Sequence, residues 1–111
     1  MSFPQNPPQY SVKTGNFYYH FKHNPEKGVT DYAYKIIGLA VHSETEEILV
    51  VYKPFYSSNH VYDLGADFYT RPLSIFLELM DKAEIGYKGP RFILISDLKI
   101  IAKLQEIDLL F

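Results

Sequence analysis

The stretch YKIIGLAVHSETEEILVVY, residues 34–52, carries the clearest fold signal of this sequence. Two apolar runs rich in Val, Ile and Tyr flank the polar connection at residues 43–47. Residues of this kind favour strands, and so short a connection between two such runs is typical of a β-hairpin. We therefore predict strands over residues 31–41 and 48–53, with Pro54 ending the pairing.

A further strand is predicted over residues 17–22, where aromatic residues follow the turn signal Thr14-Gly15-Asn16. Successive side chains of a strand point to opposite faces. The face expected to join the core consists of Phe17, Tyr19 and Phe21. The other face, polar and aromatic in character, consists of Tyr18, His20 and Lys22. A ligand or water would sit on this second face.

Two helices are expected in the second half of the chain. Pro72 suits the first position of a helix, since its missing N–H costs nothing there. An apolar stripe at helical spacing follows it and comprises Leu73, Phe76, Leu77 and Met80. Residues 92–95 indicate a last strand, and Ser96 or Asp97 can cap a C-terminal helix that runs to about Gln105.

Length and composition agree with a single small domain. The chain has 111 residues, and its aromatic content of 16% comes from ten Tyr and eight Phe, which favours β structure. The expected fold class is mainly β with flanking helices (α+β). Residues 1–14, which contain three prolines, are expected to form a flexible N-terminal segment ahead of a globular domain over residues 15–111.

The absence of cysteine excludes a disulfide framework, a thiolate nucleophile and a cysteine metal site. The net charge of −2 gives no general attraction to nucleic acid or to an anionic membrane. No apolar run approaches the length of a membrane span or of a signal-peptide core. We expect a soluble cytoplasmic protein without nucleic-acid or membrane partners.

An ordered set of short motifs resembles one known family. The motifs run Gly15-x-Phe17-x-x-His20-x-Lys22, His42-Ser43-Glu44-Thr45, Val50-Val51-Tyr52, then Arg71-Pro72 and Phe76. Together they resemble the bacterial domain-of-unknown-function family numbered 1653. The resemblance covers residues 15–92 and leaves residues 93–111 as a C-terminal extension. Where this chain has Tyr69, the family often has Trp.

The resemblance implies a small SH3-like β-roll or barrel, with a short helix after the Arg-Pro pair. It also implies a functional site without naming a ligand. Polar residues of these motifs make the candidate ligand-binding set, namely His20, Lys22, His42, Ser43, Glu44, Thr45, Tyr52 and Arg71. An unknown small polar or anionic ligand, or a short peptide segment, is the expected partner, and the planar guanidinium of Arg71 is its first expected contact.

Each of these residues also has a purely structural interpretation. The hydroxyls and carboxylate of the His-Ser-Glu-Thr turn can bond the turn's own backbone N–H groups. Arg71 can form an ion pair with Glu44 or Glu47 and so tie the loop to the sheet. These structural interpretations are alternatives to ligand binding.

An enzyme is the weaker alternative. A metal-assisted or acid/base hydrolase could use His20, His42 and Glu44 if the strands bring them together. Against it, the four histidines (His20, His23, His42 and His60) lack the i, i+4 spacing of a helical metal site. Ser43 and His42 point apart as strand neighbours, which is poor geometry for a nucleophile and its base. We expect no cofactor.

Two interaction hypotheses complete the set. Small β-barrels stack nucleic-acid bases on aromatic rings. The residues that could serve in this way are Tyr18, Tyr32, Tyr34, Tyr52 and Tyr56. The scattered Lys and Arg residues argue against this function. A homodimer through the C-terminal helix, with its end at residues 109–111, is the other hypothesis.

Overall fold

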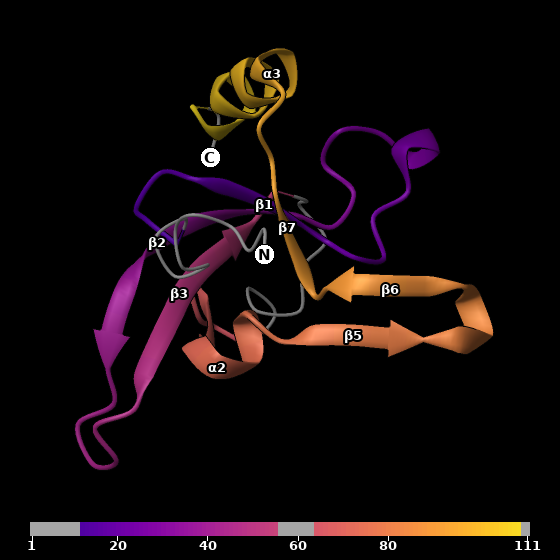
Figure 1. Cartoon of the computed structure of the whole chain (residues 1–111). Coiled ribbons are helices and arrows are strands. Elements are labelled where there is room, and N and C mark those ends of the chain that lie inside the picture. Colours follow the sequence, from indigo (N-terminus) through magenta and orange to yellow (C-terminus); the bar gives the residue numbers. More distant parts are fainter. Residues whose placement is uncertain (1–11, 56–63, 110–111) are drawn as a thin grey trace.

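The fold, taken from a computed structural model, is described over residues 12–55 and 64–109. Its elements are β1 (Phe17–His20), the 3-10 turn η2 (Pro25–Lys27), β2 (Ala33–Val41), β3 (Ile48–Pro54), β4 (Tyr69–Pro72), α2 (Leu73–Phe76), β5 (Leu79–Lys82), the 3-10 turn η3 (Ala83–Ile85), β6 (Tyr87–Pro90), β7 (Phe92–Leu94) and α3 (Leu98–Asp108). Five strands form a sheet of order β4-β3-β2-β1-β7, and β5 and β6 form a separate two-stranded sheet. Figure 1 shows the β5–β6 hairpin extending away from the larger sheet. The expected mainly β fold with a short helix and a C-terminal helix is confirmed.

The five-stranded sheet is antiparallel and strongly curved. The ring of Phe92 on β7 lies 5.7 Å from the ring of Tyr52 on β3, centroid to centroid. In a flat sheet, strands three positions apart would be separated by roughly 14 Å. No backbone pairing joins β4 to β7 in the described part of the chain, so the sheet stays open. The closed SH3-like barrel that the resemblance implies is therefore not formed by these residues.

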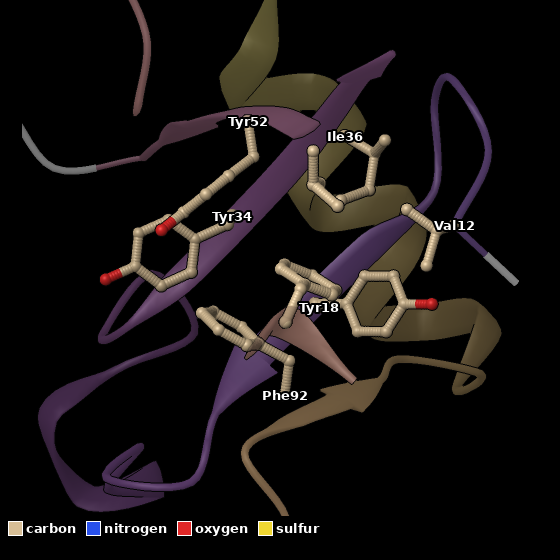
Figure 2. Close-up of a cluster of buried hydrophobic side chains, with 8 residues drawn as sticks. Val12, Tyr18, Tyr34, Ile36, Tyr52 and Phe92 are labelled. Carbon is tan, nitrogen blue, oxygen red and sulfur yellow. The ribbon is translucent and has the colours of Figure 1, made fainter. Parts of the chain in front are cut away.

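Both faces of this sheet are covered by packed side chains. On the concave face Phe76 of α2 joins a cluster of residues that are 7% exposed or less, which comprises Val12, Tyr18, Tyr34, Ile36, Val50, Tyr52, Phe76 and Phe92 (Figure 2). On the convex face the buried residues are Phe17, Ala33, Phe55, Ile95 and Leu104 of α3. Alternate residues of β1 serve the two faces, since Phe17 packs towards α3 and Tyr18 packs into the concave cluster.

The helix after Pro72 is shorter than its apolar stripe predicts. It ends at Phe76 with Leu77 as its C-cap, and Met80 lies in β5. Residues 79–82 instead pair with residues 87–90 in a hairpin. Gly86 enables the turn because it has a φ of 69°, in the left-handed region that glycine tolerates. The hairpin forms in place of further helix, because Met80 is the one residue that continues the apolar stripe beyond Leu77.

The C-terminal helix is anchored at both ends. Asp97 caps it, since its Oδ1 accepts hydrogen bonds from the backbone N–H groups of Lys99 (2.8 Å) and Ile100 (3.3 Å). At the other end Asp108 forms ion pairs with Lys35 of β2 and Lys53 of β3, both at 2.6 Å. The helix reaches Asp108, three residues beyond the predicted end at Gln105.

The packed part of the chain starts before residue 15, because Val12 is only 2% exposed. The other expectations for the N-terminal segment concern residues 1–11, which lie outside the described part. The chain end at residues 110–111 also lies outside it. Within residues 12–55 and 64–109 no helix combines the length and apolarity needed to cross a membrane.

Candidate functional site

The concave face of the sheet contains a hollow of about 340 Å³. Strands from both edges of the sheet contribute to it, because the curvature brings β4 close to β7. The residues that line it are His20, Lys22, Tyr32, Tyr34, Tyr52, Tyr69, Arg71 and Phe92. Four of the sequence-predicted site residues, His20, Lys22, Tyr52 and Arg71, thus share one recess.

Arg71 stands on the edge strand β4, opposite Val50 of β3. Its Nε donates a hydrogen bond to the hydroxyl of Tyr52 at 3.2 Å, and its guanidinium carbon lies 5.3 Å from the centroid of the Phe92 ring. Neither contact occupies the terminal amino groups of the guanidinium. Among the described residues Arg71 forms no ion pair. The ion pair considered between Arg71 and Glu44 or Glu47 is therefore absent from the described part of the chain.

His20 is held in one tautomer by its neighbour. The backbone N–H of Lys22 donates to Nδ1 of His20 at 3.2 Å, so the neutral ring carries its proton on Nε2. Burial, and secondly the positive charges of Arg71, Lys22 and Arg91, lower the pKa of His20 from 6.5 to about 4. At neutral pH this imidazole is therefore uncharged and acts as a hydrogen-bond donor through Nε2–H.

The floor and walls of the hollow are aromatic. The Phe92 ring stacks on Phe76, with centroids 4.1 Å apart and planes within 6°. Tyr34 and Tyr52 meet Phe92 edge-on at 5.9 and 5.7 Å. Their hydroxyl groups point to the same side of the cluster, away from Val12 (Figure 2). Since the Tyr52 oxygen accepts from Arg71, its own hydrogen can be donated to another group.

The electrostatic character of the hollow is positive. Lys22 and Arg71 are its charged lining residues, and no carboxylate belongs to the described lining. Arg91, which is close enough to affect His20, has its charge matched by an ion pair with Glu78. A recess whose described residues offer cations and neutral donors but no acidic group is suited to an anion.

The His-Ser-Glu-Thr turn lies elsewhere. The backbone N–H of His20 donates to the carbonyl of Tyr32, and His42 follows Tyr32 ten positions later at the far end of β2. At about 3.3 Å per strand residue, this places the turn roughly 30 Å along the strand from His20. The predicted site residues His42, Ser43, Glu44 and Thr45 are not part of the hollow's lining.

Most polar groups of the turn serve its own backbone. Nδ1 of His42 accepts hydrogen bonds from the N–H groups of Glu44 (3.2 Å) and Thr45 (3.3 Å). The hydroxyl of Thr45 accepts from the N–H of Glu47 at 3.3 Å. This is the structural interpretation considered for the turn, with His42 in the role expected of the hydroxyls. Ligand binding by these four residues remains an untested prediction.

The hydrolase hypothesis required His20, His42 and Glu44 to converge, and the structure separates the first from the other two. No group of three or more metal-ligating side chains is close enough to hold an ion in the part of the chain that the structure describes. This combination is therefore wrong as a composite site. His60, the fourth histidine considered, lies outside the described residues, as does Tyr56 of the base-stacking set.

The structure adds four lining residues to the predicted set, namely Tyr32, Tyr34, Tyr69 and Phe92. A signal for two of them was present, because Tyr32 and Tyr34 belong to the set of tyrosines considered for base stacking. Phe92 carried no such signal. Its place in the hollow depends on β7 lying beside β1, where Phe92 is paired with His20.

The fold and the hollow define a small, mainly β domain with a positively charged aromatic recess. Residues 16–93 match the model of the DUF1653 family, described as proteins of unknown function, and the chain belongs to this family. It is also similar to the crystal structure of a DUF1653 protein from Bordetella bronchiseptica, at 29% identity and a TM-score of 0.55, over 74% of this chain and 86% of that one. None of the curated proteins compared with the chain matches it.

Proposed function

We propose that this domain binds a small organic anion in the hollow, with Arg71 as its main anchor. The observation that carries the proposal is the presence of both Arg71 and Lys22 in the lining, whose described residues include no carboxylate. Such cations would be unfavourable neighbours unless water or an anion offset their repulsion. The lowered pKa of His20 reflects the same positive environment.

Each group has a distinct role in this proposal. The terminal amino groups of Arg71 bind the anion, while the bond from its Nε to Tyr52 fixes the guanidinium plane. Lys22 contributes a second positive charge, and Nε2–H of His20 donates a neutral hydrogen bond. The aromatic walls exclude water, which strengthens these interactions. The proposal assigns binding and includes no bond-making step.

Arg71→Ala tests the proposal. The ¹⁵N-labelled full chain is titrated with a panel of carboxylates and phosphates, including a peptide with a free C-terminus and its amide, while amide shifts are followed by NMR. Each charge-assisted hydrogen bond contributes roughly 1.5–3 kcal/mol, so Arg71→Ala should weaken binding at least about tenfold.

The matched control is Lys88→Ala, which removes the same charge from an exposed position on β6. This variant should bind like the wild type. If no anion shifts the signals of residues around the hollow, or if Arg71→Ala and the wild type respond alike, the proposal is wrong.

A further inference from the structure

We infer that the anion bound at Arg71 is a phosphate monoester carried by a planar ring, as in an aryl phosphate. This inference rests on the proposed function and narrows its ligand class. Three features of the hollow support it: the number of unmatched charges, the number of hydrogen-bond donors, and the position of the two more exposed tyrosine rings.

The charge of the lining fits a dianion. Arg71 and Lys22 contribute two positive charges, His20 is neutral at pH 7, and the described lining has no carboxylate. A carboxylate would leave one positive charge unmatched in the hollow. A phosphate monoester carries about −1.5 to −2 charge at pH 7 and would neutralise both cations.

The hollow offers more hydrogen-bond donor groups than the two oxygens of a carboxylate accept in good geometry. Donors are available from the terminal amino groups of Arg71, the ammonium of Lys22, Nε2–H of His20 and the hydroxyl of Tyr52. A carboxylate has two oxygens to receive them, whereas a phosphate monoester has three terminal oxygens. Donors that converge from three strands suit a tetrahedral group better than a flat one.

Two rings of the lining are open enough to stack against a ligand. Tyr34, Tyr52 and Phe92 are 7% exposed or less, whereas Tyr32 is 37% exposed and Tyr69 is half-buried. Stacking of a base on an aromatic side chain contributes roughly 1–3 kcal/mol. The hollow, at about 340 Å³, lies near the lower limit of ~300–1,000 Å³ for small-molecule sites, which suits a single ring with its phosphate.

Tyr32 is held in place at a cost in backbone energy. Its φ of 50° lies in the left-handed region, which costs a residue with a side chain about 1–2 kcal/mol. The hydrogen bonds from Ala33 N–H to the carbonyl of Thr30, and from His20 N–H to the carbonyl of Tyr32, fix this geometry. They place the Tyr32 ring 5.5 Å from the His20 ring, at the rim of the hollow. Strain of this kind often accompanies binding sites.

Three simple compounds separate the parts of this inference. Phenyl phosphate and benzoate share a ring and differ in the anion, whereas methyl phosphate retains the anion without the ring. In NMR titrations of the wild-type chain at pH 7.5 we expect phenyl phosphate to bind at least about tenfold tighter than either of the others.

The lysine pair Lys22→Ala and Lys88→Ala tests the dianion, since both are exposed and each variant loses one positive charge. Lys22→Ala should weaken the binding of phenyl phosphate more than the binding of benzoate. Lys88→Ala should change the affinity for neither compound. Tyr32→Ala should reduce the affinity for phenyl phosphate towards that of methyl phosphate.

If benzoate binds as tightly as phenyl phosphate, the phosphate inference is overturned while anion binding at Arg71 stands. Equal affinities for methyl and phenyl phosphate would overturn the inference that the ligand carries a planar ring. Absence of binding by all three compounds would remove the proposed function as well. These readings come from the wild-type chain, so they hold even if a variant fails to fold.

Discussion

The guanidinium carbon of Arg71 lies 5.3 Å from the centroid of the Phe92 ring, although the two residues stand on opposite edge strands of the five-stranded sheet. In a flat sheet, edge strands four positions apart would be separated by roughly 19 Å. The curvature of the sheet therefore creates the hollow. Phe92 belongs to the core through its stack on Phe76 and to the site through Arg71.

Because Phe92 has both roles, its substitution should reduce both stability and anion affinity, whereas substitution of Phe76 should mainly reduce stability. Phe92→Leu should lower the free energy of unfolding by about 1–3 kcal/mol, because it removes packed aromatic contacts. It should also weaken anion binding, since Arg71 loses its ring. Phe76→Leu is the control, because Phe76 contributes to the same stack without lining the hollow. Urea unfolding and ligand titration measure both effects, and equal losses of affinity in the two variants would contradict the assigned role of Phe92.

The stability of the domain should depend on the protonation of His20. Its pKa is about 4 in the folded chain and 6.5 without the fold, so between these values the unfolded state binds more protons. The His20 contribution to stability is present above pH 6.5 and is lost as the pH falls towards 4. His20→Gln should flatten the decline of the unfolding free energy over this window. Chemical denaturation at a series of pH values measures this decline in the wild type and in His20→Gln. If the decline is the same in both, His20 does not contribute to the pH dependence of stability.

Anion binding should in turn raise the pKa of His20. A negative charge beside the ring stabilises the imidazolium, so a saturating ligand moves the titration of this histidine to higher pH. An NMR titration of the His20 ring, with and without phenyl phosphate, measures the shift. The internal control is the half-buried His42, which lies at the far end of β2, and its ring signals should not move when the ligand is added. If the pKa of His20 is the same with and without the ligand, the anion does not bind beside this ring.

The features that sequence predicted well are local ones. The β2–β3 hairpin follows from the two apolar runs and their short connection, and Asp97 follows from the capping pattern. Alternation in residues 17–22 correctly grouped Phe17 with Tyr19 on the face that packs towards α3. Phe21 was expected on the same face, but β1 ends at His20 and Phe21 is not part of that cluster. Each of these depends on neighbours in the chain, so the pattern contains the information needed.

The parts of the site that sequence did not reveal depend on distant contacts. Polarity and the family motifs grouped His42 with His20, yet His20 on β1 lies beside Tyr32, just before β2 begins, and His42 follows the far end of β2. The contribution of Phe92 depends on β7 pairing with β1 and on the curvature of the whole sheet. No periodicity within residues 92–95 encodes that arrangement. Arg71, by contrast, was identified from the Arg-Pro motif and from the chemistry of its guanidinium, and it does line the hollow.

His42 should matter for the turn and not for the hollow. Its Nδ1 accepts hydrogen bonds from Glu44 and Thr45 N–H, as a capping side chain does. Loss of such a cap costs about 0.5–2 kcal/mol, so His42→Ala should destabilise the fold by that order. His42→Asn, which keeps an acceptor, should lose less. Thermal unfolding compares the variants, and a large drop in anion affinity in His42→Ala would contradict the separation of the turn from the site.

The ion pairs of Asp108 should anchor α3 to the sheet in a pH-dependent way. Burial raises the pKa of Asp108, but hydrogen bonds and charge interactions with Lys35 and Lys53 outweigh it and hold the pKa below its usual value. A lowered carboxyl pKa stabilises the fold above the ordinary pKa, and this stability is lost as the pH falls through the folded value.

Asp108→Asn should therefore reduce the unfolding free energy by about 1–2 kcal/mol at pH 7, since two partly buried lysines lose their partner. High salt should shrink the difference, because it screens these pairs. Glu106→Gln, an exposed change of the same charge on α3, should cost much less. Urea unfolding at pH 7 and at low pH measures the effect. Equal losses in the two variants, or a loss in Asp108→Asn that persists unchanged at low pH, would show that α3 is fixed by its apolar face alone.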